Sequence, residues 1–318
     1  MNQVLHVGSD GAEAFVREFC GNGRVALVTD GAAYSLSGAA EFFDPLLPKV
    51  VHLVVKTSNP KVEDVQSLLD DLQGEMVDVF VAVGGGTAID TAKLLNFATV
   101  TKLSVRDLLR QKVCPGLLPF LGVPTTAGTG AEATRFAVCY DGEEKHSIDF
   151  PEIRPSHVLL LPSLSASLPP YQKLSTNFDA YAQAVESLWA KGATSESKAY
   201  AQRALDHMDS GDWPQGAYWA GRAIDISRTT AAHAFSYYLT SHYGIPHGHA
   251  VYMVFEYICR NNNRPDRIKI VPGLKTLREL AVENGISWNQ MVEDVFAHVN
   301  LKRLGNNPVE VRKEAFDV

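Results

Sequence analysis

The sequence predicts an α/β domain built on a parallel sheet, followed by an all-helical domain. Short valine-rich runs alternate with amphipathic segments in the first half of the chain, as is typical of strands buried on both faces and their connecting helices. Strand signals largely stop near residue 162, and the second half shows helical spacing of apolar residues. A length of 318 residues also favours two domains. We expect these domains at 1–163 and 164–318.

Composition and charge exclude several classes of protein. Hydrophobic residues make up 46% of the chain, but no apolar run approaches the roughly 20 residues that a membrane-spanning helix needs. A formal net charge of -7 disfavours nucleic acid and anionic membranes as partners. The four cysteines form no CxxC pair, and the first residues lack a secretory signal pattern. We therefore expect a cytoplasmic protein that binds neither membranes nor nucleic acid.

The apolar runs of the first half are expected to form strands in chain order. RVALVTD, VVHLVVKT and VDVFVAVGGG are rich in valine and are bounded by glycine, aspartate or proline. Between the last two, apolar residues recur at helical spacing from Val62 to Leu72, and Gly74 supplies a stop. This order of strand, helix and strand is typical of a parallel sheet. Further apolar runs continue the pattern at 117–126, 136–141 and 157–161.

The second half of the chain contains segments in which apolar residues follow the helical period. No internal repeat or low-complexity linker separates it from the first half, so the change of pattern alone places the boundary. Helices are expected at 171–190, 195–208, 215–241, 250–259, 274–284 and 288–299.

Three consecutive glycines, Gly84, Gly85 and Gly86, lie directly between a predicted strand and a predicted helix. Without Cβ atoms they let the backbone approach a ligand closely, and the helix that follows directs free amides at an anion. Thr87 and Asp90 fit two interpretations, a capping box that only starts the helix or part of a phosphate-binding surface. The loop is neither GxGxxG nor a Walker sequence, so alone it does not decide between them.

A second glycine- and threonine-rich segment, GVPTTAGTGAEAT, favours the nucleotide interpretation. It follows another apolar run and offers the hydroxyls of Thr125, Thr126 and Thr129 to phosphate and ribose. We therefore expect a Rossmann-like domain that binds a dinucleotide. Asp30, at the end of the first valine-rich strand, fits either a ribose contact that favours NAD over NADP or an ordinary turn. Asn59 is included among the cofactor-binding candidates.

The stretch AAHAFSYYLTSHYGIPHGHAV holds four of the ten histidines. His233 is expected in a long helix, whereas proline and glycine would hold His247 on a tight loop before the next helix. His242 is more typical of an ordinary core or surface group. A metal site would also need a carboxylate, and the segment DAYAQAVES supplies Asp179.

Asp179, Gln183 and Glu186 are spaced to lie on one face of the same helix. Asp179 with His233 and His247 would give a cation one oxygen and two nitrogen ligands and leave a position open, as catalytic zinc or iron requires. Gln183 could add an amide oxygen. The sequence therefore predicts a site for one divalent ion, Fe(II) or Zn(II).

At this point a resemblance becomes specific. The segments VGGGTAIDTAK, VPTTAGTGAEAT, DAYAQAVES and IPHGHAV, in this order, resemble the iron-containing (group III) alcohol dehydrogenase family over nearly the whole chain. Within it, AGRAIDISRTTAAHAFSYYLTSHYGIPHGHAV is most similar to the phosphonoacetaldehyde reductase (hydroxyethylphosphonate dehydrogenase) branch. The resemblance implies a dehydroquinate synthase-like fold, NAD(H) or NADP(H) in the cleft between the domains, one divalent metal ion and a homodimer. The implied reaction is the reversible reduction of a small aldehyde to its alcohol.

The resemblance also implies roles for individual residues. The pyrophosphate glycines of the family correspond to the three glycines above, and its threonine loop corresponds to the three threonines. A lysine after that loop falls on Lys145. The metal ligands of the family, one aspartate and three histidines, fall on Asp179, Gln183, His233 and His247.

Gln183 departs from the family, which has histidine there. An amide oxygen is a weaker donor to zinc or ferrous iron than imidazole, so metal affinity should fall, although three ligands can still form a catalytic site. This departure leaves open a catalytically idle paralogue that only binds nucleotide. A dehydroquinate synthase-like or glycerol-1-phosphate dehydrogenase-like enzyme on the same fold is a further alternative.

Side chains around these motifs could assist the implied reaction. Tyr237 follows His233 by one helical turn and fits either a proton relay or core packing. With Lys145 and His249 it completes the set of catalytic candidates. A phosphonate-bearing substrate would need cationic or donor groups. Candidates by proximity to the motifs are Arg135, Lys145, Arg228 and His249, of which Arg135 and Arg228 also fit solvated surface charge.

Overall fold

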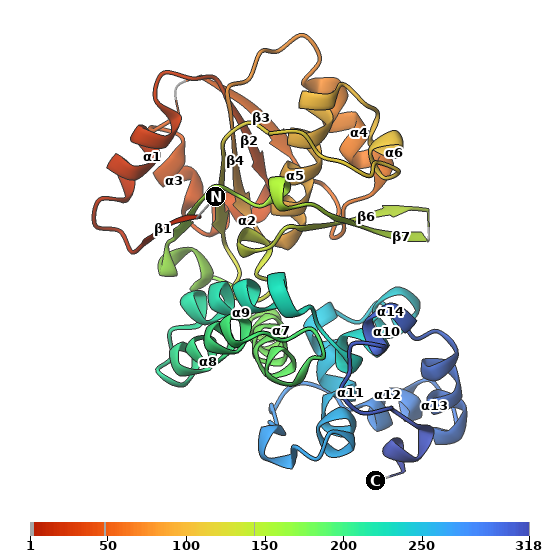
Figure 1. Cartoon of the computed structure of the whole chain (residues 1–318). Coiled ribbons are helices and arrows are strands. Elements are labelled where there is room, and N and C mark those ends of the chain that lie inside the picture. Colours follow the sequence, from red (N-terminus) through yellow and green to blue (C-terminus); the bar gives the residue numbers. More distant parts are fainter. Residues whose placement is uncertain (1–2, 48, 143, 318) are drawn as a thin grey trace. The chain divides into compact units, whose positions relative to one another are not determined.

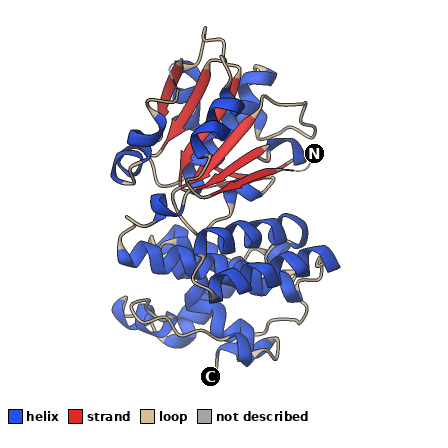
Figure 2. Cartoon of the chain, turned by 90° about the vertical axis from the view of Figure 1, so that its left-hand side faces the viewer, coloured by secondary structure: helices blue, strands red, loops and turns tan. Residues whose placement is uncertain are grey.

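The computed structural model describes residues 3–47, 49–142 and 144–317. Two compact units divide the chain (Figure 1). The first comprises Met1–Thr126 and Ala131–Leu168, and the second comprises Ala127–Gly130 and Pro169–Val318. Figure 2 shows strands in the first unit and helices throughout the second, which confirms the predicted fold class. Within the described residues, no helix is both long and apolar enough to cross a membrane.

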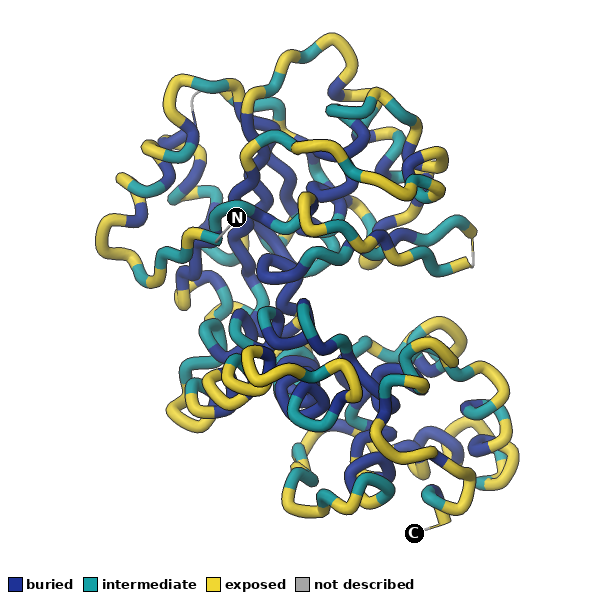
Figure 3. The backbone as a smooth tube through the Cα atoms, viewed as in Figure 1, coloured by how far each residue is buried: buried dark blue, intermediate teal, exposed yellow. Residues whose placement is uncertain are grey.

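A six-stranded parallel sheet forms the centre of the first unit. Its central strands are buried along their whole length (Figure 3), which explains why their sequences are almost continuously apolar. The first strand lies at an edge and is only partly buried, so its short sequence carried no clear signal. The order across the sheet is β1 (Val4–Val7), β8 (His157–Leu160), β5 (Phe120–Pro124), β4 (Val79–Gly84), β2 (Val25–Thr29) and β3 (Val50–Val54).

Helices cover both faces of this sheet. Along β4, Phe80 and Ala82 belong to one apolar cluster, whereas Val79, Val81 and Val83 belong to the other. The first cluster includes side chains of α4 and α5, and the second includes side chains of α1 and α3. The helices of this unit are α1 (Ala12–Cys20), α2 (Gly31–Leu36), α3 (Ala39–Phe43), α4 (Val62–Asp71), α5 (Gly86–Thr101) and α6 (Val105–Leu108).

The apolar run at 136–141 forms a strand outside the parallel sheet. It is β6 (Phe136–Asp141), which pairs with β7 (Glu144–Asp149) in a separate antiparallel ribbon. Its alternating burial is the pattern of a ribbon with only one face against the core.

The second unit packs its helices around one apolar core. Helix α7 contacts α8, α9 and α11, and therefore lies at the centre of the unit. The predicted single helix at 215–241 is wrong, because the chain breaks between two helices at Arg228, whose φ of 63° cannot continue a helix. The helices are α7 (Pro170–Trp189), α8 (Ser195–Asp209), α9 (Trp213–Ser227), α10 (Ala231–Tyr243), α11 (His247–Asn261), α12 (Leu277–Glu283), α13 (Trp288–Ala297) and α14 (Leu301–Leu304).

Candidate cofactor and metal sites

The triple-glycine turn joins the carboxyl end of β4 to the start of α5. A Cβ added at Gly84 would lie 2.6 Å from the Cβ of Ala88 and 2.9 Å from Cγ of Asp30, so only glycine fits there. The backbone N–H of Gly85 donates to Oδ2 of Asp30 at 2.9 Å. The free amides of the first turn of α5 therefore lie at the carboxyl edge of a parallel sheet, the usual place for a nucleotide phosphate.

Asp30 follows β2 at the same edge of the sheet. Its Oδ1 is buried and has no hydrogen-bond partner among the described residues. Burial raises the pKa of this carboxyl group, and the Gly85 N–H opposes the rise. A buried carboxylate oxygen without a donor is costly, and a ribose hydroxyl is a donor that would satisfy it.

The structure corrects the capping interpretation of Thr87 and shows which groups Asp90 contacts. Thr87 does not cap α5, because its hydroxyl donates to the carbonyl of Ser58 at 2.7 Å. Asp90 holds the fully buried Lys93 at 3.2 Å with Oδ1 and accepts the N–H of Val138 at 3.0 Å with Oδ2. A buried ammonium needs such a carboxylate, so Asp90 has a structural role that ties α5 to β6.

The threonine segment divides between the two units. In the first unit, Thr125 donates its N–H to the carbonyl of Gly84 at 3.0 Å, and its buried Oγ1 has no partner among the residues that the structure describes. Thr126 lies beside Gly85. Thr129 belongs to the second unit, where its carbonyl accepts a hydrogen bond from Gln183.

Two further cofactor candidates, Asn59 and Lys145, lie on a loop and on the antiparallel ribbon of the first unit. Asn59 follows β3 in an exposed loop, where its carbonyl accepts the hydroxyl of Thr57 at 2.9 Å. Lys145 lies on β7, and its Nζ is 5.9 Å from the ring centroid of Tyr140.

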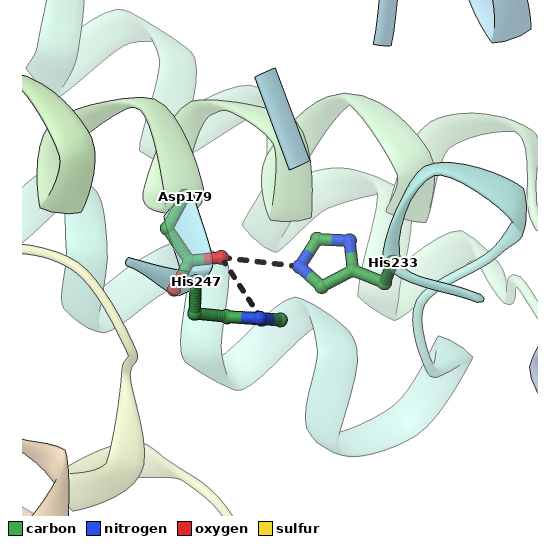
Figure 4. A group of neighbouring side chains, drawn as sticks. All are labelled: Asp179, His233 and His247. Atoms are coloured by element: carbon green, nitrogen blue, oxygen red, sulfur yellow. Dashed lines mark hydrogen bonds and ion pairs between the residues drawn. The ribbon is translucent and has the colours of Figure 1, made fainter. Parts of the chain in front are cut away.

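In the second unit, Asp179, His233 and His247 form the predicted cluster. Their ligand atoms all lie within 4.8 Å of one another. Oδ1 of Asp179 is 3.1 Å from Nε2 of His233 and 3.8 Å from Nε2 of His247 (Figure 4). Asp179 and His233 are buried, whereas the side chain of His247 is 34% exposed, so the cluster is open on that side. An oxygen and two imidazole nitrogens at this spacing are a donor set suited to Zn(II) or Fe(II).

Gly248 allows this convergence. Asp179 lies on α7 and His247 begins α11, and the two helices approach so closely that a Cβ on Gly248 would lie 1.9 Å from the Ser175 carbonyl oxygen. The Ser175 hydroxyl also accepts the N–H of His249 at 3.0 Å. His247 was expected on a tight loop, but the structure places it in the first turn of α11, and this turn packs directly against the helix that carries the carboxylate.

Gln183 lies one turn after Asp179 on α7 and is also buried. Its amide nitrogen donates to the Thr129 carbonyl at 3.3 Å, and its side chain hydrogen bonds with Asp179. Its Oε1 is buried and has no partner within the described residues. Burying a carbonyl oxygen without a hydrogen-bond donor costs free energy. A cation bound beside Asp179 would remove this cost, because Oε1 of Gln183 could bind it as well.

A second buried carboxylate, Glu186, contacts His233 from the other side. Its Oε2 lies 2.5 Å from Nδ1 of His233. Burial alone would lower the pKa of His233, but the carboxylates of Glu186 and Asp179 outweigh it and raise that pKa to about 9. Burial alone would likewise raise the pKa of both acids, but the imidazoles outweigh it and lower both values. The sequence placed Glu186 on the same helix face but assigned it no role, although its spacing of seven residues from Asp179 was the available signal.

Two of the catalytic candidates, Tyr237 and His249, have different neighbours in the second unit. The ring of Tyr237 stacks on His247 at 6.0 Å, and its hydroxyl hydrogen bonds with Arg303. His249 has partners at both ring nitrogens, since its Nδ1 lies 2.6 Å from the Tyr171 hydroxyl and its Nε2 lies 2.9 Å from the Lys275 carbonyl. Both ring nitrogens are therefore engaged away from the cluster.

Two of the proposed phosphonate-binding cations are also engaged within their own units. Arg135 pairs with Asp149 at 3.0 Å, and Arg228 donates to the Asp225 carbonyl at 3.0 Å.

A glycine turn at the carboxyl edge of a parallel sheet and a buried cluster of carboxylate and imidazole groups are features of a class of nucleotide- and metal-dependent enzymes. The sequence profile of one family, described as iron-containing alcohol dehydrogenase, matches residues 3–162. The chain belongs to this family and is an oxidoreductase of the alcohol dehydrogenase type.

Individual relatives agree with this assignment. The chain is 33% identical to phosphonoacetaldehyde reductase of Streptomyces viridochromogenes over 76% of its own length and 67% of the relative. The structure of sulfoacetaldehyde reductase from Bifidobacterium kashiwanohense, solved with NAD+, is similar with a TM-score of 0.85 and 26% identity, covering 99% of this chain and 95% of that one. An iron-containing alcohol dehydrogenase from Thermotoga maritima gives a TM-score of 0.81 and 26% identity over 99% of this chain and 96% of that one.

Proposed function

We propose that this protein uses NAD(P)H and a divalent metal ion to reduce a small aldehyde that carries an acidic group. Phosphonoacetaldehyde, reduced to 2-hydroxyethylphosphonate, is the substrate we favour. The observation that carries the proposal is the cluster of Asp179, His233 and His247 in a chain similar to two aldehyde reductases. The substrates for which these two enzymes are named both join an aldehyde to an acidic phosphonate or sulfonate group.

The side chains of the second unit would hold the ion. Asp179, His233 and His247 would be its ligands, with Oε1 of Gln183 as a fourth. When bound, an Fe(II) or Zn(II) ion supplies Lewis acidity to a carbonyl oxygen, and the reduced nicotinamide supplies hydride. The partly exposed side of His247 leaves room for the substrate. Tyr237, whose ring stacks on His247, would shield that ligand and would exchange a proton with the product oxygen.

The first unit would bind the dinucleotide. The amides after Gly84 and Gly85 would hold the pyrophosphate, and the unpartnered hydroxyl of Thr125 would add a hydrogen bond. The unpartnered Oδ1 of Asp30 would accept a ribose hydroxyl and repel a 2′-phosphate, which favours NAD over NADP.

The test is turnover by the purified protein, followed by NADH and NADPH absorbance with and without added Fe(II) or Zn(II). We expect phosphonoacetaldehyde to exceed the uncharged propanal by at least about 10-fold in kcat/KM, because a hydrogen bond to a charged group contributes about 1.5–3 kcal/mol. Chelation of the metal should abolish the reaction. The proposal is rejected if no aldehyde is reduced in the presence of either metal, or if a sugar phosphate is cyclised without net NADH change.

A second candidate, an idle paralogue that binds nucleotide without turnover, is favoured by one observation only, the replacement of a family ligand by Gln183. We expect wild-type protein to bind Zn(II) and Gln183→His to bind it about 10-fold more tightly, because imidazole is a better donor than an amide oxygen. Calorimetric titration of the metal-free proteins measures both affinities. Binding by Gln183→His alone would favour the idle paralogue.

A further inference from the structure

We propose that Glu186 is a positioning residue that fixes the ring of His233, so that Nε2 presents its lone pair to a metal ion beside Asp179 and His247. The proposal rests on the proposed function, since it concerns the same metal cluster. It assigns a role to a buried carboxylate outside the ligand set.

Both oxygens of Glu186 are held by hydrogen bonds. Oε1 accepts the Thr230 hydroxyl at 2.6 Å and the Ala232 N–H at 2.8 Å. Oε2 accepts the Thr230 N–H at 3.2 Å and lies 2.5 Å from Nδ1 of His233. The Trp189 indole donates to the same Thr230 hydroxyl at 3.0 Å and fixes its direction. The side chain of Glu186 is fully buried, so water does not compete for these contacts.

Two of these contacts are made at the start of α10. Thr230 is the N-cap of that helix but provides no side-chain cap, and Glu186 on α7 accepts the N–H of Thr230 and the N–H of Ala232 in its place. A carboxylate at a helix N-terminus satisfies free amides and interacts favourably with the helix dipole. Because His233 lies in this first turn, the position of its ring is set by the same helix, α7, that carries Asp179.

The hydrogen bond to Glu186 determines which nitrogen of the His233 imidazole can bind a metal ion. A ring that donates its Nδ1–H to a carboxylate keeps Nε2 as the nitrogen for a metal, and the negative partner increases the basicity of Nε2. The structure places the two nitrogens accordingly, with Nδ1 toward Glu186 and Nε2 toward Asp179. Without an acceptor at Glu186, no contact of the His233 ring would favour the tautomer that is protonated at Nδ1.

Glu186→Gln tests the inference because glutamine keeps the size and one acceptor oxygen, but can place an N–H opposite Nδ1. We expect zinc affinity, measured by calorimetric titration, to fall about 10- to 100-fold, the usual cost of losing such a partner of a metal-bound histidine. Glu132→Gln is the matched control, since Glu132 is also buried but lies in the first unit. Burial raises the pKa of Glu132 to about 7, so a neutral side chain fits there, and zinc affinity should not change.

A spectroscopic measurement keeps the inference testable even if Glu186→Gln does not fold. Nitrogen-15 and proton NMR of histidine-labelled, zinc-loaded wild-type protein should show a proton on Nδ1 of His233 that is shifted far downfield, as expected for a short hydrogen bond to the Glu186 carboxylate. Protonation at Nε2, or a Glu186→Gln variant with wild-type zinc affinity, would overturn the inference while leaving aldehyde reduction by the wild type intact. A wild-type protein that binds no zinc would overturn both this inference and the proposed metal-dependent function.

Discussion

Asp179→Asn is expected to lower kcat/KM for aldehyde reduction by about 1,000-fold, or about 4 kcal/mol of transition-state stabilisation. Asp179 is the one carboxylate of the three clustered ligands, and its Oδ1 faces both imidazoles. Asparagine keeps the shape but removes the negative charge that attracts a divalent ion. The reaction should therefore fail through loss of the metal.

Metal analysis and steady-state kinetics check this prediction together. Asp206→Asn, on the exposed surface of α8, is the control and should retain both metal and activity. Far-UV circular dichroism should show that both variants keep the helical unit folded. An Asp179→Asn protein that keeps its metal and its activity would show that the cluster is not the catalytic site.

Gly248→Ala is expected to destabilise the protein by about 3 kcal/mol and to weaken metal binding, although Gly248 contributes no ligand. The new Cβ would lie 1.9 Å from the Ser175 carbonyl oxygen, 2.8 Å from its carbon and 3.0 Å from Cβ of Asp179. The first two of these atoms are backbone, so a side-chain rotation cannot relieve the clash. Helix α11 must move away from α7 and carry His247 with it.

Urea unfolding and zinc titration measure the two effects of Gly248→Ala. The matched control is Gly116→Ala, because an added Cβ at Gly116 meets no atom within 4 Å and its backbone is not in the left-handed region. The control should change the unfolding free energy by less than about 0.5 kcal/mol. An equally small effect at Gly248 would contradict the close approach of the two helices.

The sequence by itself determined the fold class and predicted the three side chains that cluster in the second unit. Continuous valine runs predicted the strands β2 and β4, because strands buried on both faces have no polar side. The spacing of Asp179 and Gln183 predicted one helical face, and the proline and glycines around His247 predicted a rigid turn before a helix. These signals are local, since each depends on residues within a few positions of one another.

Only the tertiary structure decided which polar partner each buried side chain finds. Asp90 pairs with Lys93 and accepts a backbone N–H from a strand 48 residues away. His249 contacts the Tyr171 hydroxyl and a carbonyl group 26 residues away. Glu186 contacts His233, which is 47 residues away in the sequence. The break at Arg228 likewise carries no glycine or proline to reveal it. Local periodicity determines which face of a helix or strand is buried, but the hydrogen bonds of a buried polar group depend on remote elements that packing brings into contact.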